Sequence, residues 1–566
     1  MEAGDLRCSK EVMNLDRLGS LYPTRLSFSR TLIRRMSREN WSIKKTSFNL
    51  DKKGMGTAIY QINTNSSPLW FVVFSEHLSP EDRTDRVIAE KWDATFTLTS
   101  DEPTSSSLKR LKENVPLQEM GRYSTKEIVL SRANKSVRLF DYVTEKLSAG
   151  TQPDEAELMN VGYLIRTTAV YGNGKFGLSD LASIKSKKLF TLPFQPEMLC
   201  VYLVRCFSFD WVEHVAYFRN PTYFKPLANH LKQALGVGNA TGLGMAPFLV
   251  NHPKLVCRWI TARENALAVV RRKKIVTAED KAKFIKLLNT ARLHLKEWPT
   301  TDAEQKKKNL TLKKELFDIS SKTNELSRDS LWDNLISWAQ STLTMEGQEL
   351  LNSLAIETNP KLVDEYELET ASEEVMGIEP NMVLTSILDI IKIRYSWALS
   401  LDLESCESQA RFWYRSEEKE EPRLGWRFKE PGADKELRLG IAQNVRKLYD
   451  ELLLGEVSLE ATTVAEFLLT RPIWRETIQR IQSLKNCRYA EIEGNLLDGK
   501  FRAVNLLRCK LAMFGATKFD PKSDLWIRIT LFQGAPLPKD LNEANSEAVS
   551  LTSLAKDLSN VASDFV

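Results

Sequence analysis

The stretch Trp41–His77, WSIKKTSFNLDKKGMGTAIYQINTNSSPLWFVVFSEH, decides the fold class predicted for this chain. Three short segments in it alternate apolar and polar residues or cluster β-branched and aromatic ones, and turn residues separate them: 41–50, 55–63 and 68–77. We therefore predict an antiparallel β-meander over 40–100, which 86–99 continues. Gln61-Ile62 should pair with Leu69-Trp70 as a hairpin.

After about residue 120 the apolar residues recur at a spacing near 3.6, which predicts helices. The predicted helical segments are 130–147, 156–170, 198–207, 223–235, 254–274, 278–297, 310–319, 329–343, 381–403, 437–454 and 463–484. Strand character returns at 489–493 and 524–533. The predicted fold class is α+β and predominantly α-helical, with a C-terminal strand pair beyond a large helical region.

The 566 residues exceed what a single core organises, so several domains are expected. The predicted division is a basic N-terminal segment 1–39, a β-rich domain 40–107, a helical domain 108–299 with two glycine-rich loops, a helical domain 300–486, an α+β element 487–538 and a weakly ordered tail 539–566.

Composition is that of a folded protein, with 42% hydrophobic and 27% charged residues. The 79 basic and 74 acidic residues leave a formal charge of only +5, so a dedicated nucleic-acid binder is less favoured. Basic patches at 25–45 and 271–274 keep binding of nucleic acid or protein open as an alternative.

Seven cysteines are scattered without a CxxC pair, which predicts neither a disulfide framework nor a zinc knuckle. A reducing, cytoplasmic location follows as the expectation. The chain has no apolar run of the ~18–20 residues that a membrane span needs, so no membrane association is predicted. The sequence identifies no cofactor and no oligomeric state.

Two glycine tracts imitate ligand-binding loops. Gly172, Gly174 and Gly177 fit GxGxxG, but helical spacing before them predicts a helix that ends at Gly172 rather than a dinucleotide fold. Alternatively, Arg166 and Lys175 flank a loop of amides that binds an anion. The second tract, 236–244, either packs helices closely or receives an anion at the following helix start.

The five histidines show no HExxH or similar ligand spacing, so no metal site is predicted. His252, between Asn251 and Pro253, is the histidine best placed for acid–base chemistry, and its alternative role is only to begin the helix.

The densest charged and aromatic stretch is 411–428, RFWYRSEEKEEPRLGWRF, with five Lys/Arg, four Glu and five aromatic residues. Arginine forks suit phosphate and carboxylate, and aromatic rings stack on planar ligands. The predicted substrate-binding residues are Arg411, Tyr414, Arg415, Arg423 and Arg427, with Arg166 and Lys175 in support. The predicted catalytic residues are Glu417, Glu421 and His252. An intramolecular ionic network or a partner surface remains the alternative for this stretch.

These patterns predict an enzyme that acts on an anionic, phosphate- or carboxylate-bearing small molecule in an interdomain cleft. The competing functions are a nucleic-acid- or protein-binding protein and a structural assembly subunit. Lys518 and Arg528, near the C-terminal strand pair, are further candidates for a positive cleft.

Overall fold

The structure is a computed structural model, and the residues that it describes are 6–77, 94–114, 127–167, 190, 194–242, 249, 252–296, 300, 302–363, 376–403, 411–415, 422–426, 440–455, 458–489, 491–492, 503–521 and 526–541. The chain forms two compact units. Unit 1 comprises 1–22, 242–276 and 322–510, and unit 2 comprises 23–241, 277–321 and 511–566.

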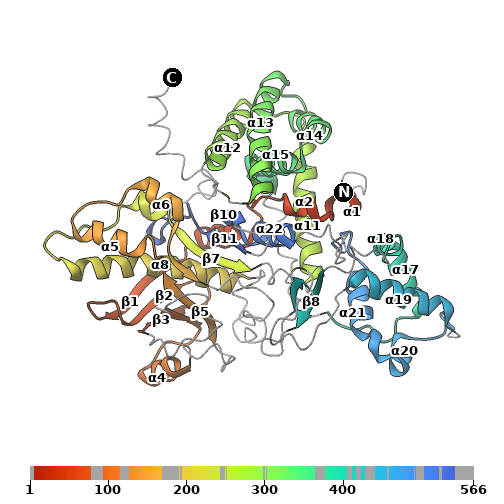
Figure 1. Ribbon diagram of the computed structural model, residues 1–566, viewed down its shortest axis with the longest axis horizontal. Helices are drawn as coiled ribbons and strands as arrows, with labels where there is room; N and C mark the ends of the chain where they lie inside the picture. Colours follow the sequence, from red (N-terminus) through yellow and green to blue (C-terminus); the bar gives the residue numbers. More distant parts are fainter. Residues whose placement is uncertain are drawn as a thin grey trace. The chain divides into compact units, whose positions relative to one another are not determined.

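Unit 2 is built around a nine-stranded sheet of order β1-β2-β3-β4-β5-β6-β7-β11-β10 (Figure 1). Its strands are β1 (Ser42–Leu50), β2 (Gly56–Asn63), β3 (Leu69–Ser75), β4 (Ala94–Thr99), β5 (Glu127–Lys135), β6 (Tyr163–Thr167), β7 (Gly236–Gly242), β10 (Ala516–Pro521) and β11 (Trp526–Leu531). Strands β1 to β6 pair antiparallel in sequence order, whereas β6 and β7 are parallel. The C-terminal strands thus complete the sheet that the N-terminal meander begins.

The predicted fold class is confirmed as α+β and predominantly helical, with an N-terminal antiparallel sheet and a C-terminal strand pair. The predicted hairpin register is also confirmed, since Gln61 lies opposite Trp70 and Ile62 opposite Leu69. The C-terminal pair consists of β10 and β11, so the expected strand at 489–493 was wrong. Tyr489 is buried there outside any strand.

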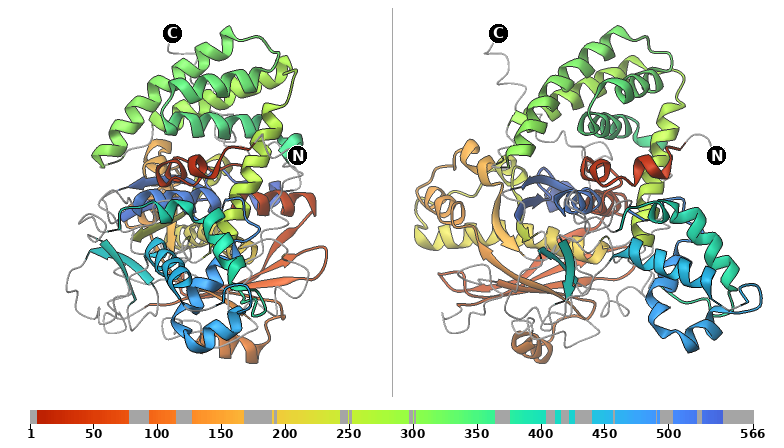
Figure 2. Two further views of the ribbon diagram at one scale, coloured as in Figure 1. Left: turned by 90° about the vertical axis from the view of Figure 1, so that its right-hand side faces the viewer. Right: turned by 45° about the vertical axis from the view of Figure 1, so that its right-hand side comes forward.

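Unit 2 also contains helices, of which α4 and α8 contact the sheet. They are α3 (Phe28–Arg38), α4 (Ser105–Asn114), α5 (Phe140–Ser148), α6 (Glu155–Val161), α8 (Gln195–Arg219), α9 (Asn229–Gln233), α12 (Ala278–Lys296) and α13 (Ala303–Glu325), which crosses the unit boundary. Helix α4 covers part of β3, where Leu111 packs on Val72 and Phe74 (Figure 2). The 25-residue α8 contacts β4, β5 and β6 and is buried on most sides, as expected of a core helix.

A fully buried arginine of α8 ties together the segments that enter β7 and leave β11. The Arg205 guanidinium donates to the carbonyls of Leu235 at 2.7 Å, Ala535 at 2.9 Å and Lys232 at 3.1 Å. Tyr202, one turn earlier, donates to the Pro536 carbonyl at 2.7 Å. Desolvation by burial lowers the pKa of Arg205. The carbonyl dipoles around the guanidinium partly offset the cost of burying its charge.

Two segments predicted as continuous helix contain strands. The segment 130–147 divides into β5 and α5, and 156–170 divides into α6 and β6. Gly162, with φ of 81°, ends α6 in the left-handed conformation that favours glycine. The tract that begins at Gly236 was expected as a loop between helices, but it forms β7. Parallel β6 and β7 are joined through α8. The first glycine tract, Gly172–Gly177, lies outside the described residues.

Unit 1 consists mainly of helices. They are α1 (Ser9–Val12), α2 (Leu15–Gly19), α11 (Pro253–Arg271), α14 (Leu331–Thr342), α15 (Met345–Thr358), α16 (Pro360–Val363), α17 (Leu384–Arg394), α18 (Ser396–Leu399), α19 (Ile441–Leu454), α20 (Val464–Thr470), α21 (Arg475–Ser483) and α22 (Ala503–Phe514), whose end crosses into unit 2. Helices α17, α19 and α21 contact one another (Figure 1). No helix among the described residues is both long and apolar enough to cross a lipid bilayer.

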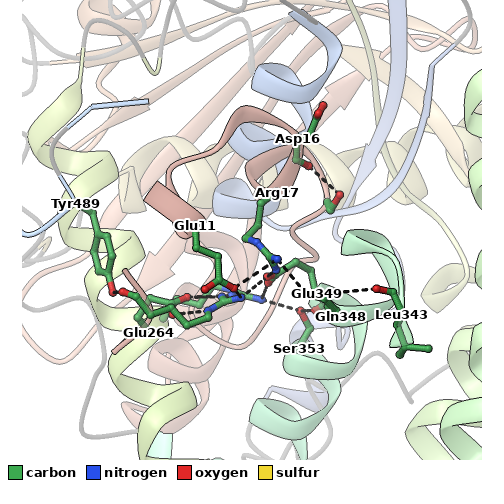
Figure 3. Close-up of polar contacts among 12 residues, drawn as sticks. Glu11, Asp16, Arg17, Glu264, Leu343, Gln348, Glu349, Ser353 and Tyr489 are labelled. Carbon is green, nitrogen blue, oxygen red and sulfur yellow. Dashed lines mark hydrogen bonds and ion pairs between the residues drawn. The ribbon is translucent and has the colours of Figure 1, made fainter. Parts of the chain in front are cut away.

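A buried ionic cluster fixes the N-terminal segment in unit 1 (Figure 3). Arg7 donates two hydrogen bonds to Glu264 of α11, at 2.6 and 2.8 Å, and a third to Glu349 of α15 at 2.6 Å. Glu349 also accepts from Arg17 at 2.8 Å and pairs with Arg263 at 2.7 Å. Burial alone would raise the pKa of Glu349, but the arginines, Arg7 foremost, hold it far below its ordinary range.

Half-exposed Glu11 lies 3.4 Å from Arg17 and 3.8 Å from Arg7, so the cluster combines three arginines with three carboxylates. Such a balanced cluster adds little net stability compared with an apolar core, but removing one member leaves a buried charge unpaired. The cluster therefore specifies where the N-terminal segment docks.

Replacing Glu349 with glutamine should lower the free energy of unfolding by about 3 kcal/mol, because three arginines lose their shared carboxylate. Since the folded-state pKa of Glu349 is depressed, its contribution is present above the unfolded pKa and is lost as pH falls. The difference from wild type should therefore persist at pH 6 and shrink below about pH 4 in urea titrations. Asp333→Asn is the control, since it breaks the more exposed Arg271–Asp333 pair and should cost about 0.5 kcal/mol.

Lys510 of α22 is 1% exposed, and desolvation by burial lowers its pKa to about 7. In the unfolded chain, Lys510 keeps its proton up to the ordinary pKa of 10.5. The free energy of unfolding of the wild type should therefore rise between pH 7 and pH 10.5. Lys510→Met should therefore be more stable than wild type by about 2 kcal/mol at pH 7, and the difference should shrink toward pH 11. Denaturant titrations of both proteins at pH 7 and pH 11 measure this difference in the free energy of unfolding. A variant less stable than wild type at pH 7 would contradict it.

Candidate functional site

A pocket of about 770 Å³ lies within unit 2, where the C-terminal strand pair approaches α6 and the turn between β5 and α5. Its volume is in the range of small-molecule sites. We call it the basic pocket, because its lining includes Lys135, Arg138, Arg166, Lys518 and Arg528 but only two acids, Glu157 and Asp520.

The register of the sheet brings the pocket residues of β10 and β11 to one face. Lys518 lies opposite Thr530 and Asp520 lies opposite Arg528 in this antiparallel pair. Since side chains two residues apart share a face of a strand, all four residues point to the same side. All four line the basic pocket.

Glycines of β7 allow the neighbouring strands, β6 and β11, to pack closely beside the pocket. A Cβ on Gly238 would lie 2.4 Å from the Tyr163 ring, and Tyr163 lines the pocket. A Cβ on Gly236 would lie 2.3 Å from the Leu531 carbonyl oxygen and 2.7 Å from the Thr530 side chain. The second glycine tract therefore serves close strand packing beside the site.

Two cations of the pocket are held by the protein. Half-buried Arg166 lies opposite Asn134 in the β5–β6 pair, and the Asn134 amide oxygen accepts from the Arg166 guanidinium at 3.3 Å. The Lys518 ammonium donates to the carbonyl of Met159 in α6 at 3.0 Å. These contacts orient both charges, and the Arg166 guanidinium, with five N–H groups, keeps donors for a ligand.

Arg138 and Arg528 are exposed at the pocket, where a ligand can reach them. The Lys135 ammonium behaves differently, because it lies 5.2 Å from the ring centroids of both Phe140 and Trp211. Cation–π attraction therefore holds Lys135 toward these rings. Four cationic heads then remain for the pocket itself.

The pocket carboxylates differ in burial. Asp520 is 5% exposed, whereas Glu157 is exposed on α6.

His294 of α12 lies near this site, since desolvation by burial and then the positive charge of Lys518 lower its pKa. The imidazole is therefore neutral at neutral pH. With cations in excess, the electrostatics of the pocket favour an anion.

Of the predicted site residues, Arg166 lies in the basic pocket. His252 caps the N-terminus of α11 in unit 1, so it belongs to a different compact unit from that pocket. Lys175, Glu417, Glu421 and Arg427 lie outside the described residues.

The charged stretch forms a hairpin of β8 (Arg411–Arg415) and β9 (Pro422–Trp426), in which Tyr414 pairs with Arg423. The helix predicted over 381–403 is divided into α17 and α18 and ends at Leu399, before this stretch. Site roles for Arg411, Arg415 and the other residues of this stretch remain predictions.

Sequence reasoning gave Arg138 and Asp520 no role, and it named Lys518 and Arg528 only as additions. The alternation in 524–533 was a usable signal, because it sets Arg528 on one face of a strand. The strand β10 was missed, since the sequence analysis predicted strands only at 489–493 and 524–533 in this region. In the described part of the chain, no three His, Cys, Asp or Glu side chains gather so as to hold a metal ion.

Replacing Gly236 and Gly238 of β7 with alanine should lower the free energy of unfolding by different amounts. Gly236→Ala places a Cβ against a backbone carbonyl that cannot rotate away, so it should destabilise the protein by about 3 kcal/mol. Gly238→Ala meets the half-exposed Tyr163 ring, which can turn, so about 1 kcal/mol is expected. Denaturant unfolding measures both. Gly377→Ala, where nothing lies within 4 Å of the new Cβ, is the matched control. Equal effects at the two β7 positions would contradict this account.

Comparisons of the chain with protein-family models, with curated proteins and with solved structures find no match.

Proposed function

We propose that the protein binds an anionic small molecule, bearing phosphate or carboxylate groups, in the basic pocket of unit 2 and acts on it as an enzyme. The observation that carries this proposal is the excess of cations over carboxylates around one cavity of ligand size. Arginine forks match the oxygens of phosphate and carboxylate groups in charge and spacing.

The position of each cation supports a division of roles. Arg166 and Lys518 are held by Asn134 and Met159, so they offer fixed charges at little entropic cost on binding. Arg138 and Arg528 are exposed and can close on a ligand that has entered. An aromatic ring, Tyr163, lines the same cavity and offers a flat apolar surface for the rest of the molecule.

For the enzymatic part of the proposal, Asp520 is the candidate for acid–base work. It is the buried carboxylate of the pocket, and it lies opposite Arg528 across the strand pair. A carboxylate beside a bound substrate can accept a proton from it, which is the role of a general base. This assignment takes the catalytic role that we predicted for Glu417 and Glu421, which lie outside the described residues.

The nucleic-acid alternative has less support from its basic patches. Arg25 and Arg34 are buried, and Arg35 pairs with Glu39 at 2.8 Å. In the second patch, Arg271 pairs with Asp333. Cations already engaged within the protein contribute less to a phosphate-binding surface, so the small-molecule proposal is favoured.

Calorimetric titration of the full chain with pyrophosphate, ATP and citrate tests the proposal. At least one probe should bind, and Arg528→Gln should weaken that binding by about tenfold or more, because a charge-assisted hydrogen bond is lost. Arg528 is exposed, so this change should leave the fold intact. Arg166→Gln should weaken binding as well.

Arg219→Gln is the matched control, since it removes an exposed arginine of the same unit at the end of α8, away from the pocket lining. It should leave the affinity unchanged. If Arg219→Gln and Arg528→Gln reduce affinity equally, binding reflects total charge and the pocket has no part in it. For the enzymatic step, Asp520→Asn should abolish turnover of the bound molecule while binding persists.

A further inference from the structure

The Tyr163 ring in the basic pocket lies with one face against a glycine of the neighbouring strand. A Cβ built on Gly238 would lie 2.4 Å from Cδ1 of this ring and 2.5 Å from both Cε1 and Cγ. Nearly equal distances to three consecutive ring atoms place that Cβ over the face of the ring and not beyond its edge. The ring face therefore rests on Gly238. Since Tyr163 is half-exposed and lines the pocket, its opposite face is the one that a ligand can reach.

A shift in strand register turns Tyr163 and Arg166 to the same side of the sheet. Tyr163 lies opposite Gly236 and Arg166 lies opposite Gly238, so three residue steps on β6 match two on β7. In a regular strand, side chains three positions apart would point to opposite faces, and one extra residue corrects this. The ring leans along the strand toward Gly238, which is the position opposite Arg166. The aromatic face and the guanidinium are therefore neighbours at the pocket.

Hydrogen-bonding side chains of α6 lie at the same end of the pocket as the ring. The helix ends at Val161, two residues before Tyr163, and its exposed Glu157 and Asn160 line the pocket. An amide offers both donors and acceptors, whereas a carboxylate accepts. Nucleobase edges carry donors and acceptors of the same kinds. The ring and these two side chains together suit a flat ligand with polar edges.

The cations extend from the ring across the sheet. Arg166 is on β6 itself, Arg528 is on β11 and Lys518 is on β10, which are two and three strands away from β6. At ~4.8 Å per strand, these separations are about 10 and 14 Å. The pocket volume of about 770 Å³ is also well above the ~300 Å³ of the smallest ligand sites. A ligand that reaches both the ring and the distant cations must therefore be elongated.

We propose that the anionic ligand of the basic pocket is a nucleotide, whose base stacks on the exposed face of the Tyr163 ring. Its phosphates bind Arg166 and the two cations of the C-terminal strand pair, Lys518 and Arg528. The ribose between base and phosphates supplies the length that the site requires. This inference rests on the function proposed above, because it needs the pocket to bind an anion.

Calorimetric titration of the full chain with ATP, GTP, CTP and UTP, and with tripolyphosphate for comparison, tests the proposal. At least one nucleotide should bind about tenfold or more tightly than tripolyphosphate, because only a nucleotide can stack on the ring. If tripolyphosphate binds as tightly as every nucleotide, the nucleotide inference is overturned while the proposed anion site stands. If the pocket binds none of these anions and no citrate, the proposed function itself fails and this inference fails with it.

Variants at position 163 separate stacking from charge. Tyr163→Ala should weaken binding of the preferred nucleotide by about tenfold and leave the affinity for tripolyphosphate unchanged. Tyr163→Phe keeps the ring and should keep both affinities. Tyr163→Leu is the substitute if the alanine variant folds poorly, since it covers Gly238 with an apolar side chain that has no ring.

Tyr217→Ala is the matched control, because it removes an exposed tyrosine of the same unit, on α8 and outside the pocket lining. It should change neither affinity. Equal losses for nucleotide and tripolyphosphate in Tyr163→Ala, or an unchanged nucleotide affinity, would overturn the stacking role of the ring.

Discussion

The arrangement of unit 2 depends on a steric constraint, namely that the positions of Gly236 and Gly238 in β7 have no space for a side chain. At Gly236 the obstacle is the backbone of β11, and at Gly238 it is the Tyr163 ring of β6. Only glycine lets a strand fit this closely between two neighbours. The C-terminal strands can therefore join the N-terminal sheet, and this junction creates the basic pocket.

A buried arginine complements this constraint from the helical side. Arg205 binds carbonyls before β7 and after β11, so it links the two segments whose strands the glycines bring together. Backbone carbonyls in such a place need donors, because unpaired polar groups are costly in the interior. The long side chain of Arg205 donates hydrogen bonds to several of these carbonyls at once.

The sequence predicted local structure better than it predicted pairing over long distances. Alternation was readable in β2, whose buried and half-buried residues alternate, and even the register at Gln61–Trp70 followed from the turn. The parallel strand β7 was not readable, since glycines on one face remove the alternation on which such predictions rest. The short helix α6 and strand β6 merged into one apparent helix, although the break at Gly162 marked the end of α6.

The candidate site shows the same limit. Arg166 could be named from the sequence, but its neighbours Lys518 and Arg528 lie more than 350 positions away, and only the sheet order brings them to it. The sequence analysis favoured 411–428 instead, because charged and aromatic residues are dense there. Such density is a local property of the sequence. A binding site depends on which residues the topology assembles, and sheet order is a property that local spacing does not encode.

Charge balance separates the two groups of ionic residues in this protein. Around Glu349 the arginines and carboxylates are equal in number and bonded to one another, so the cluster has no charge left for a ligand. Around the basic pocket the cations exceed the carboxylates and two of the arginines are exposed. Excess charge beside a cavity is unfavourable for folding, because like charges repel and no hydrophobic burial compensates. The ligand that we propose for this pocket would supply the missing negative charge.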